Sequence, residues 1–153
     1  MNVGDKLPEV LGVDQNGKEI KAEDFRGRKL VLYAYPKDNT SGCTAEACSL
    51  RDNREALAAN GYEVLGISKD SAASHQKFID KYELNFSLIA DTDTTLLQAL
   101  GAWGEKTMCG RKCVGTLRTT FLVNEEGVVE HIFTPKQINT KTHAEQILAV
   151  TEK

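Results

Sequence analysis

Four cysteines are the residues of this sequence with the most evident capacity for chemistry. They form two local pairs, a C-x4-C pair at Cys43 and Cys48 and a C-x3-C pair at Cys109 and Cys113. Neither pair has the C-x2-C spacing that is usual in zinc sites and in thiol–disulfide exchange sites. A free cysteine acts either as a nucleophile or as a small buried apolar side chain. The surroundings of each cysteine must decide between these two roles.

Cys43 lies at the start of a predicted helix, 43–60, which follows the turn-forming segment 37–42 and a predicted buried strand, 29–35. The first turn of a helix has unpaired N–H groups and the positive end of the helix dipole, and both stabilise a thiolate. At such positions the pKa of a cysteine falls from about 8.5 to as low as about 3.5–7.5. Sites in open α/β sheets gather beyond the carboxyl ends of the strands. The sequence therefore predicts that Cys43 is a nucleophilic thiolate.

The residues around Cys43 resemble the active site of a known family. Pro36, Thr40 and Cys43 form P-x-x-x-T-x-x-C, which is similar to the signature of the peroxiredoxins. The wider YPKDNTSGCTAEACSLRD resembles the Q-type subfamily, also called bacterioferritin comigratory protein, although Ser41 stands where that subfamily usually has proline. GTLRTTFLV resembles the strand that carries the family's active-site arginine, here Arg118. The resemblance extends over nearly the whole chain. It implies a thioredoxin-like fold and reduction of hydrogen peroxide and organic hydroperoxides by electrons from thioredoxin or a similar dithiol.

Each residue that the resemblance marks has a physical role in this chemistry. Arg118 can stabilise the thiolate and donate hydrogen bonds to the departing oxygen. The hydroxyl of Thr40 can orient the peroxide, and Pro36 can shield the sulfur without offering a competing N–H group. The backbone N–H groups of Gly42 and Cys43 can hold the second peroxide oxygen. Taken singly, each of these residues is more commonly structural; the prediction depends on their occurring together.

The second step of the reaction points to Cys48. A sulfenic acid on Cys43 condenses readily with a nearby thiol, and one branch of the Q-type subfamily has its second cysteine at this spacing. Five helical residues advance about 7.5 Å and leave the two side chains about 140° apart. A disulfide needs Cα atoms within about 7 Å and converging side chains. We therefore predict that the first turns of the helix unwind when Cys48 resolves Cys43; otherwise Cys48 is a buried apolar residue and an external thiol recycles the enzyme.

Cys109 and Cys113 lie in a basic segment, KTMCGRKCVG, where the subfamily often has tyrosines. Neighbouring cations favour thiolates, and a C-x3-C pair on a helix would face one side. Two alternatives stay open: a second redox pair that relays the disulfide, or side chains that fill the space of lost aromatic rings. We favour the second because Gly110 disfavours a regular helix.

The remaining pattern predicts the elements that must position these residues. A hairpin is expected at 9–20 around Gln15-Asn16-Gly17, and a second hairpin around 124–127. Strands are predicted at 29–35, 62–68, 86–90, 117–123 and 128–133, and helices at 43–60, 71–82, 91–100 and 142–150. This order is typical of an α/β fold with a mixed sheet flanked by helices. We interpret residues 1–153 as one thioredoxin-like domain.

Composition and charge exclude several classes of protein. The chain has 153 residues, 41% of them hydrophobic, and a net charge of −3 without a basic face, which argues against a nucleic-acid partner. No apolar run approaches the ~20 residues that span a bilayer, and the N-terminus lacks a signal-peptide pattern, so we expect a cytoplasmic protein. His75, His131 and His143 form no ligand pattern, and we expect no metal or other cofactor. The resemblance suggests a monomer or a weak dimer.

Three other functions are compatible with parts of the sequence. Four cysteines could ligate one metal ion, but the spacing is poor and Pro36, Thr40 and Arg118 would have no role. A thiol–disulfide oxidoreductase would share the fold but lacks the C-x2-C motif. A non-enzymatic interaction protein would tolerate replacement of Cys43.

Overall fold

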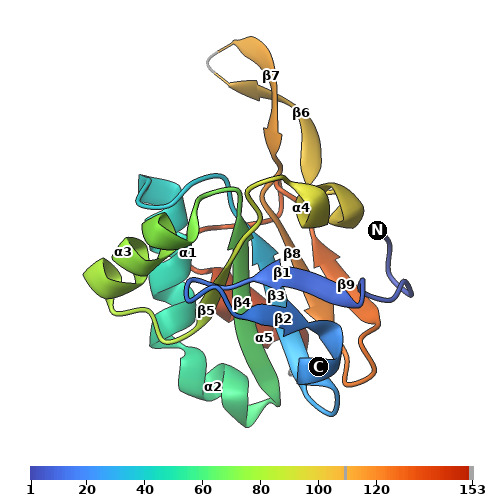
Figure 1. Ribbon diagram of the computed structural model, residues 1–153. Helices are drawn as coiled ribbons and strands as arrows, with labels where there is room; N and C mark the ends of the chain where they lie inside the picture. The colour runs from blue at the N-terminus through green and yellow to red at the C-terminus, as the bar shows by residue number, and fades with distance from the viewer. Residues whose placement is uncertain (109, 152–153) are drawn as a thin grey trace.

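The computed structural model describes residues 1–108 and 110–151. Its centre is a five-stranded mixed sheet in the order β5-β4-β3-β8-β9 (Figure 1). The strands are β3 (Lys29–Ala34), β4 (Tyr62–Ser68), β5 (Ser87–Ala90), β8 (Thr119–Val123) and β9 (Val129–Phe133). Strands β3, β4 and β5 are parallel to one another. On the other side of β3, β8 pairs antiparallel with β3, and β9 pairs antiparallel with β8. The predicted mixed sheet is confirmed.

Strand β3 explains how the two faces of the sheet are covered. Its side chains alternate between two apolar clusters: Leu30 and Leu32 enter one, and Val31 and Tyr33 enter the other. A strand that is buried on both faces must be apolar throughout, which is why 29–35 is a continuous apolar run. The centre of the sheet is therefore inaccessible, and chemistry is confined to its ends.

Helices cover one face of the sheet, and a hairpin with one helix covers the other. The helices are α1 (Ser41–Asp52), α2 (Arg54–Ala59), α3 (Ala72–Tyr82), α4 (Thr95–Leu100) and α5 (His143–Thr151), with a 3-10 turn at Ala22–Phe25. Side chains of α1, α2, α3 and α5 join the cluster that contains Val31, whereas α4 joins the cluster that contains Leu32. Within the described part of the chain, no helix is both long and apolar enough to cross a bilayer.

The predicted N-terminal hairpin is confirmed. It consists of β1 (Val10–Val13) and β2 (Glu19–Lys21) and crosses the front of the sheet (Figure 1). Its turn is held by Asp14 Oδ1, which accepts hydrogen bonds from the N–H groups of Asn16 and Lys18 at 2.8 and 3.0 Å. Gly17 has a φ of +77°, a value that glycine adopts without strain.

Predicted helix ends are largely confirmed by their hydrogen bonds. Ser71 caps α3, since its Oγ accepts from Ser74 N at 3.1 Å. The carboxylate of Asp91 accepts from the N–H groups of Leu96 and Leu97 in α4. Gly101 ends α4 in the left-handed conformation.

The predicted helix 43–60 differs from the structure in two ways. Helix α1 begins at Ser41, two residues earlier, and a break at Asn53 separates it from α2. The Asn53 side chain donates to the carbonyl of Ser49 at 2.8 Å, and its backbone leaves the helical region. Short amide side chains compete with helical backbone hydrogen bonds in this way. The segment that carries Cys43 and Cys48 is thus a separate, three-turn helix.

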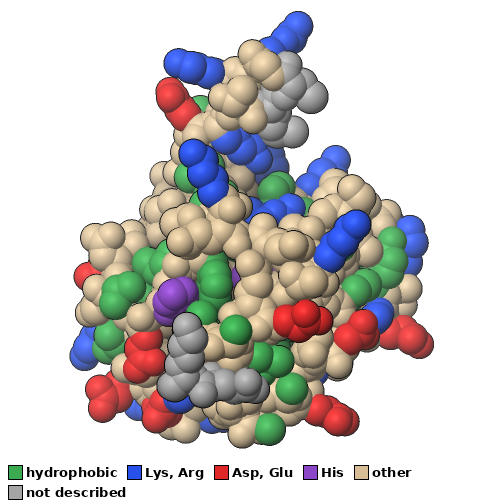
Figure 2. Space-filling view, turned by 180° about the vertical axis from the view of Figure 1, so that it is seen from behind, with side chains coloured by type: hydrophobic (Ala, Val, Ile, Leu, Met, Phe, Trp, Pro, Cys, Tyr) green, Lys and Arg blue, Asp and Glu red, His purple; other side chains and the backbone are tan. Residues whose placement is uncertain are grey.

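Residues around Cys113 form a two-stranded arm that the sequence did not predict, although Gly110 was expected to disfavour a regular helix there. Strands β6 (Trp103–Met108) and β7 (Arg111–Thr116) are antiparallel, and Gly110 has a φ of +76°. The arm projects from the body (Figure 1), and Figure 2 shows Lys and Arg side chains along it. Cys113 is partly exposed and lies opposite Lys106, whereas Cys109 lies outside the described residues. The helical geometry for a C-x3-C pair is therefore absent from this arm.

Candidate active site

The candidate site lies at the carboxyl end of β3, where the chain turns at Pro36 and enters α1 (Figure 1). Cys43 is the third residue of α1 and only 1% exposed. Its position in the first helical turn agrees with the prediction from sequence. The helix start therefore places its N–H groups and positive dipole end beside the sulfur.

Arg118 reaches Cys43 because of the antiparallel register between β3 and β8. Ala34 at the end of β3 pairs with Thr119 at the start of β8, so the residue before β8 lies at the same end of the sheet as Cys43. Arg118 Nη2 donates to Cys43 Sγ at 3.2 Å. Its other terminal nitrogen, Nη1, donates to Glu46 Oε1 at 2.6 Å. The planar guanidinium thus joins the sulfur to a buried carboxyl group.

Burial and charge act in opposite directions on this cluster. Burial opposes the charge of Arg118, but Glu46 and Cys43 together raise the pKa of Arg118 above its usual value. Burial raises the pKa of Glu46 from 4.5 to about 7, although Arg118 acts to lower it. Within the described residues, Glu46 Oε2 has no hydrogen-bond partner, and it lies 3.8 Å from His143 Nε2. Cys43 therefore faces the permanent charge of Arg118, and the carboxyl group of Glu46, which pairs with Arg118, can gain or lose its proton near neutral pH.

Thr40 leaves the start of α1 uncapped. It occupies the N-cap position, yet its side chain makes no capping hydrogen bond, and Oγ1 instead donates to the carbonyl of Lys37 at 2.9 Å. The first N–H groups of a helix have no acceptor within the helix. The N–H groups of Gly42 and Cys43 lie in this uncapped first turn, next to Thr40.

A cavity of about 260 Å³ adjoins this cluster. Pro36 and Arg118 line it, together with apolar side chains from the segments before β8 and after β9. The lining residues are Pro36, Lys106, Thr116, Leu117, Arg118, Pro135, Ile138 and Thr140. This lining combines apolar side chains with two cations, Lys106 and Arg118.

Cys48 lies in the same uninterrupted helix as Cys43 and is partly exposed. Both thiols are free. Five residues of α-helix separate them by about 7.5 Å along the axis and point them about 140° apart. The reduced helix that sequence reasoning predicted is therefore present, and a disulfide between the two cysteines requires that it unwind.

Sequence reasoning missed two contributors to this region. Glu46 was not singled out, although it lies three residues after Cys43 and falls within the apolar stripe that continues through Ala47 and Leu50. A charged residue inside a buried stripe is the signal that could have identified it. Asp38 was also missed; it is buried and contacts His75, which is fully buried.

Comparisons with known proteins agree with this geometry. The sequence profile of the AhpC/TSA family matches residues 3–132. The chain belongs to this family. It is 44% identical over 133 residues to the putative peroxiredoxin bcp of Coxiella burnetii, covering 87% of this chain and 88% of that protein. It is 38% identical to peroxiredoxin Bcp of Escherichia coli, covering 97% and 94% of the two chains.

Solved structures of the same family share the fold. PrxQ of Xylella fastidiosa superposes with a TM-score of 0.89 at 31% identity, covering 99% of this chain and 96% of that one. The bacterioferritin comigratory protein of Xanthomonas campestris, studied for its alkyl peroxide reduction activity, superposes with a TM-score of 0.87 at 30% identity, with 99% and 98% covered. The thioredoxin-like fold and the peroxiredoxin family are thereby confirmed. The chain is a thiol peroxidase that uses a peroxide and a thiol reductant.

Proposed function

We propose that Cys43 carries out this activity on hydrogen peroxide and small organic hydroperoxides, and that a thioredoxin-type dithiol restores the enzyme. The observation that carries the proposal is the 3.2 Å contact between Arg118 Nη2 and Cys43 Sγ at the start of α1. A guanidinium and unpaired helix N–H groups around one sulfur favour its thiolate, which is the nucleophilic form. The alkyl peroxide activity of the related Xanthomonas protein supports organic hydroperoxides as substrates.

The first step is displacement at oxygen. The Cys43 thiolate attacks one peroxide oxygen, the S–O bond forms as the O–O bond breaks, and the second oxygen leaves with the bonding electrons. That oxygen takes up a proton to become water or an alcohol, and Cys43 becomes a sulfenic acid. Arg118 lies where it can donate to the developing negative charge, while the Thr40 hydroxyl and the N–H groups of Gly42 and Cys43 hold the substrate in line.

The second step assigns Cys48 as the resolving thiol. Its sulfur attacks the sulfenic sulfur of Cys43, a disulfide forms, and the oxygen leaves as water. Because both residues belong to one intact helix, α1 must unwind first. Unwinding also exposes the disulfide, so an external dithiol can reduce it by two thiol–disulfide exchanges.

Cys109 and Cys113 retain two alternatives in this scheme. As a second redox pair they would accept the Cys43–Cys48 disulfide; otherwise they are side chains of the projecting arm without a redox role. Cys113 is partly exposed and lies opposite Lys106 in the arm, so a solvent-borne partner can reach it. Mass spectrometry of peroxide-treated protein distinguishes them, since a relay produces a Cys109–Cys113 disulfide.

Peroxide-dependent oxidation of NADPH, coupled through thioredoxin and its reductase, tests the whole scheme. Cys43→Ser should abolish turnover, whereas Cys48→Ser should preserve the first oxidation and lose recycling by thioredoxin. Arg118→Met should slow oxidation of Cys43 by about 100-fold or more, which is the usual loss for one oriented donor. Arg118→Lys, which keeps the charge but not the two-pronged geometry, is the matched control and should retain part of the rate. Full activity of Cys43→Ser would refute the scheme.

A further inference from the structure

Asp38 is a buried carboxylate in the turn between β3 and α1, two residues before Thr40. Its oxygens bind groups from two elements. Tyr35, directly after β3, donates its hydroxyl to Oδ1 at 2.5 Å. From α3, Ser74 donates to Oδ2 at 2.8 Å, and His75 Nδ1 lies 2.7 Å from the same oxygen. Burial raises the pKa of Tyr35 well above its usual value, so this hydroxyl keeps the proton that it donates.

His75 is fully buried, and both of its ring nitrogens face oxygen acceptors. Nε2 lies 2.8 Å from the carbonyl oxygen of Ile89 in β5, and a carbonyl oxygen can only accept, so Nε2 carries a proton. A second proton must lie between Nδ1 and Asp38 Oδ2. Asp38, Asp70 and His75 are close enough together to ligate a metal. However, these hydrogen bonds use both nitrogens of His75, so the group is built as a hydrogen-bond network.

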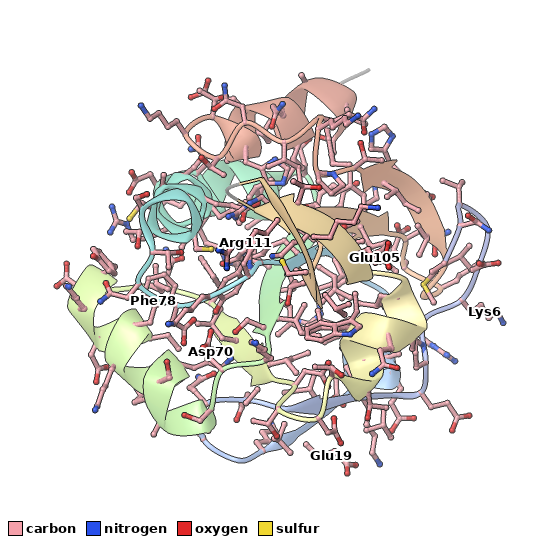
Figure 3. The ribbon with its side chains drawn as sticks, turned by 90° about the horizontal axis from the view of Figure 1, so that it is seen from above. Lys6, Glu19, Asp70, Phe78, Glu105 and Arg111 are labelled. Carbon is pink, nitrogen blue, oxygen red and sulfur yellow. The ribbon has the colours of Figure 1, made fainter. Side chains whose placement is uncertain are left out.

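The backbone of the same turn is fixed as well. The N–H of Asp38 donates to Asp70 Oδ2 at 2.8 Å, just beyond β4. The next residue, Asn39, accepts from Lys81 Nζ at 3.2 Å and from the hydroxyl of Tyr82 at 3.0 Å, both from α3. Asn39 has a φ of +61°, a conformation that asparagine tolerates better than most residues. Figure 3 views this end of the sheet from above, with the labelled Asp70 beside α3.

These contacts from α3 end at Asn39, before α1 begins at Ser41. Thr40 has only the local hydrogen bond from Oγ1 to Lys37, and its carbonyl oxygen accepts the helical bond from Thr44 N. We propose that the Asp38–His75 pair is a positioning device, which fixes the turn that leads to Thr40, before α1, while α1 itself unwinds and rewinds. This inference rests on the proposed peroxidase function. It assigns Asp38 and His75 as positioning residues that do not touch the peroxide.

Asparagine at position 38 provides a matched control. In Asp38→Asn the amide can donate to His75 Nδ1 and Oδ1 can still accept from Tyr35, with a neutral His75 that keeps its bond to Ile89. The Ser74 hydroxyl can reverse its role and accept. Asp38→Asn can therefore keep the hydrogen bonds to Tyr35, Ser74 and His75 while a neutral amide replaces the carboxyl group. Asp38→Ala removes these bonds, and His75→Gln can reach only one of the two acceptors that the imidazole joins.

The test measures oxidation of Cys43 by hydrogen peroxide in the full-length reduced protein, by rapid quenching with an alkylating reagent and mass spectrometry. Asp38→Ala and His75→Gln should each slow this step by about tenfold or more, since misplacement by about 1 Å can cost up to 100-fold. Asp38→Asn should stay within about twofold of the wild type. The Asp38→Ala, His75→Gln double variant should be no slower than the slower single variant, because the two residues act as one unit.

Side-chain ¹⁵N NMR of histidine gives a readout that does not depend on activity. The Nε2–H of His75, which donates to the carbonyl of Ile89, should give a slowly exchanging signal in both the wild type and Asp38→Asn; its loss from folded Asp38→Asn would show that asparagine does not preserve the network. Folded Asp38→Ala or His75→Gln protein that reacts at the wild-type rate would overturn the inference, as would an Asp38→Asn variant as slow as Asp38→Ala. If Asp38→Ala does not fold, the remaining two variants still decide. A wild-type protein that does not react with peroxide would instead refute the proposed function itself.

Discussion

Arg118 and Glu46 form the electrostatic centre of the site at the scale of single residues. One guanidinium nitrogen contacts the Cys43 sulfur, and another binds a carboxyl group that has no exposed surface. A buried carboxyl with only one of its two oxygens hydrogen-bonded resists ionisation, which is why the pKa of Glu46 is raised to about 7. The charge next to Arg118 consequently varies with pH in the range where the enzyme would operate.

The raised pKa of Glu46 predicts a pH dependence of stability. The folded state holds this proton up to about pH 7, whereas an unfolded Glu releases it near 4.5. Between these values the folded state binds more protons, so the free energy of unfolding falls as pH rises, by on the order of 3 kcal/mol. Glu46→Gln should flatten this slope. Urea unfolding of reduced protein at several pH values measures it.

The comparison must use the difference between Glu46→Gln and wild type. Burial lowers the pKa of His143, so that residue contributes a slope of the opposite sign, with stability rising as pH increases toward 6.5. Because His143 Nε2 lies 3.8 Å from Glu46 Oε2, the two contributions are coupled, and the comparison is repeated in a His143→Gln background in which His143 no longer titrates. A difference curve that is flat between pH 4.5 and 7 would contradict the assigned pKa.

Helix α1 has to serve two purposes at the scale of elements. As an intact helix it places the sulfur of Cys43 at its N-terminus, and it is held to the sheet by buried Ala47 and Leu50. The proposed resolution step adds a second requirement, that α1 unwinds to bring Cys48 to Cys43. The break at Asn53 separates α1 from α2, so unwinding need not extend into the following helix. The short length of α1 keeps the number of hydrogen bonds to be broken small.

Hydrogen exchange should detect this unwinding. After one equivalent of peroxide, amides of 41–52 should lose protection in the wild type, because the disulfide cannot form in the intact helix. Amides of α2 and α5 should keep most of theirs. Cys48→Ser is the control: it can be oxidised at Cys43 but not cross-linked, so its helix should stay protected. Unchanged protection of 41–52 in disulfide-bonded wild type would show that the helix need not open.

At the scale of the whole molecule, the central sheet separates the apolar cluster that contains Cys43 from a second apolar cluster. Cys43 belongs to the cluster beneath α1, α2, α3 and α5, whereas Leu32 belongs to the cluster beneath the N-terminal hairpin and α4. The β6–β7 arm extends beyond both and carries an exposed Val114. The proposed unwinding of α1 therefore disturbs only the cluster that contains Cys43, and the opposite cluster can hold the sheet in place.

Substitutions in the second apolar cluster should affect stability without affecting chemistry. Leu32→Ala removes a fully buried side chain and should lower the free energy of unfolding by about 2–5 kcal/mol. Val114→Ala on the arm is the exposed comparison and should change it by less than about 0.5 kcal/mol. Urea unfolding under reducing conditions measures both. Folded Leu32→Ala protein should oxidise Cys43 at the wild-type rate; a slower rate would show that the two clusters are coupled.

The sequence by itself determined most of the order of elements, the mixed sheet and the segment from Pro36 to Cys48 that resembles the family's active site. Local signals suffice for these: continuous apolar runs, caps such as Ser71, and a motif within one stretch of chain. Local signals did not place Arg118 at the site; only the resemblance to a known family did. The β6–β7 arm was not predicted, because strand pairing across a turn, which depends on the partner strand, decided the conformation there.

Only the tertiary structure decided which distant groups surround the sulfur and the turn before it. Glu46 meets Arg118 across 72 positions of sequence, and Asp38 meets His75 across 37. The antiparallel register of β3 with β8 and the packing of α3 beside the turn bring them together, and no spacing along the chain encodes either contact. Burial then sets their protonation, because desolvation depends on what the whole fold places around a group.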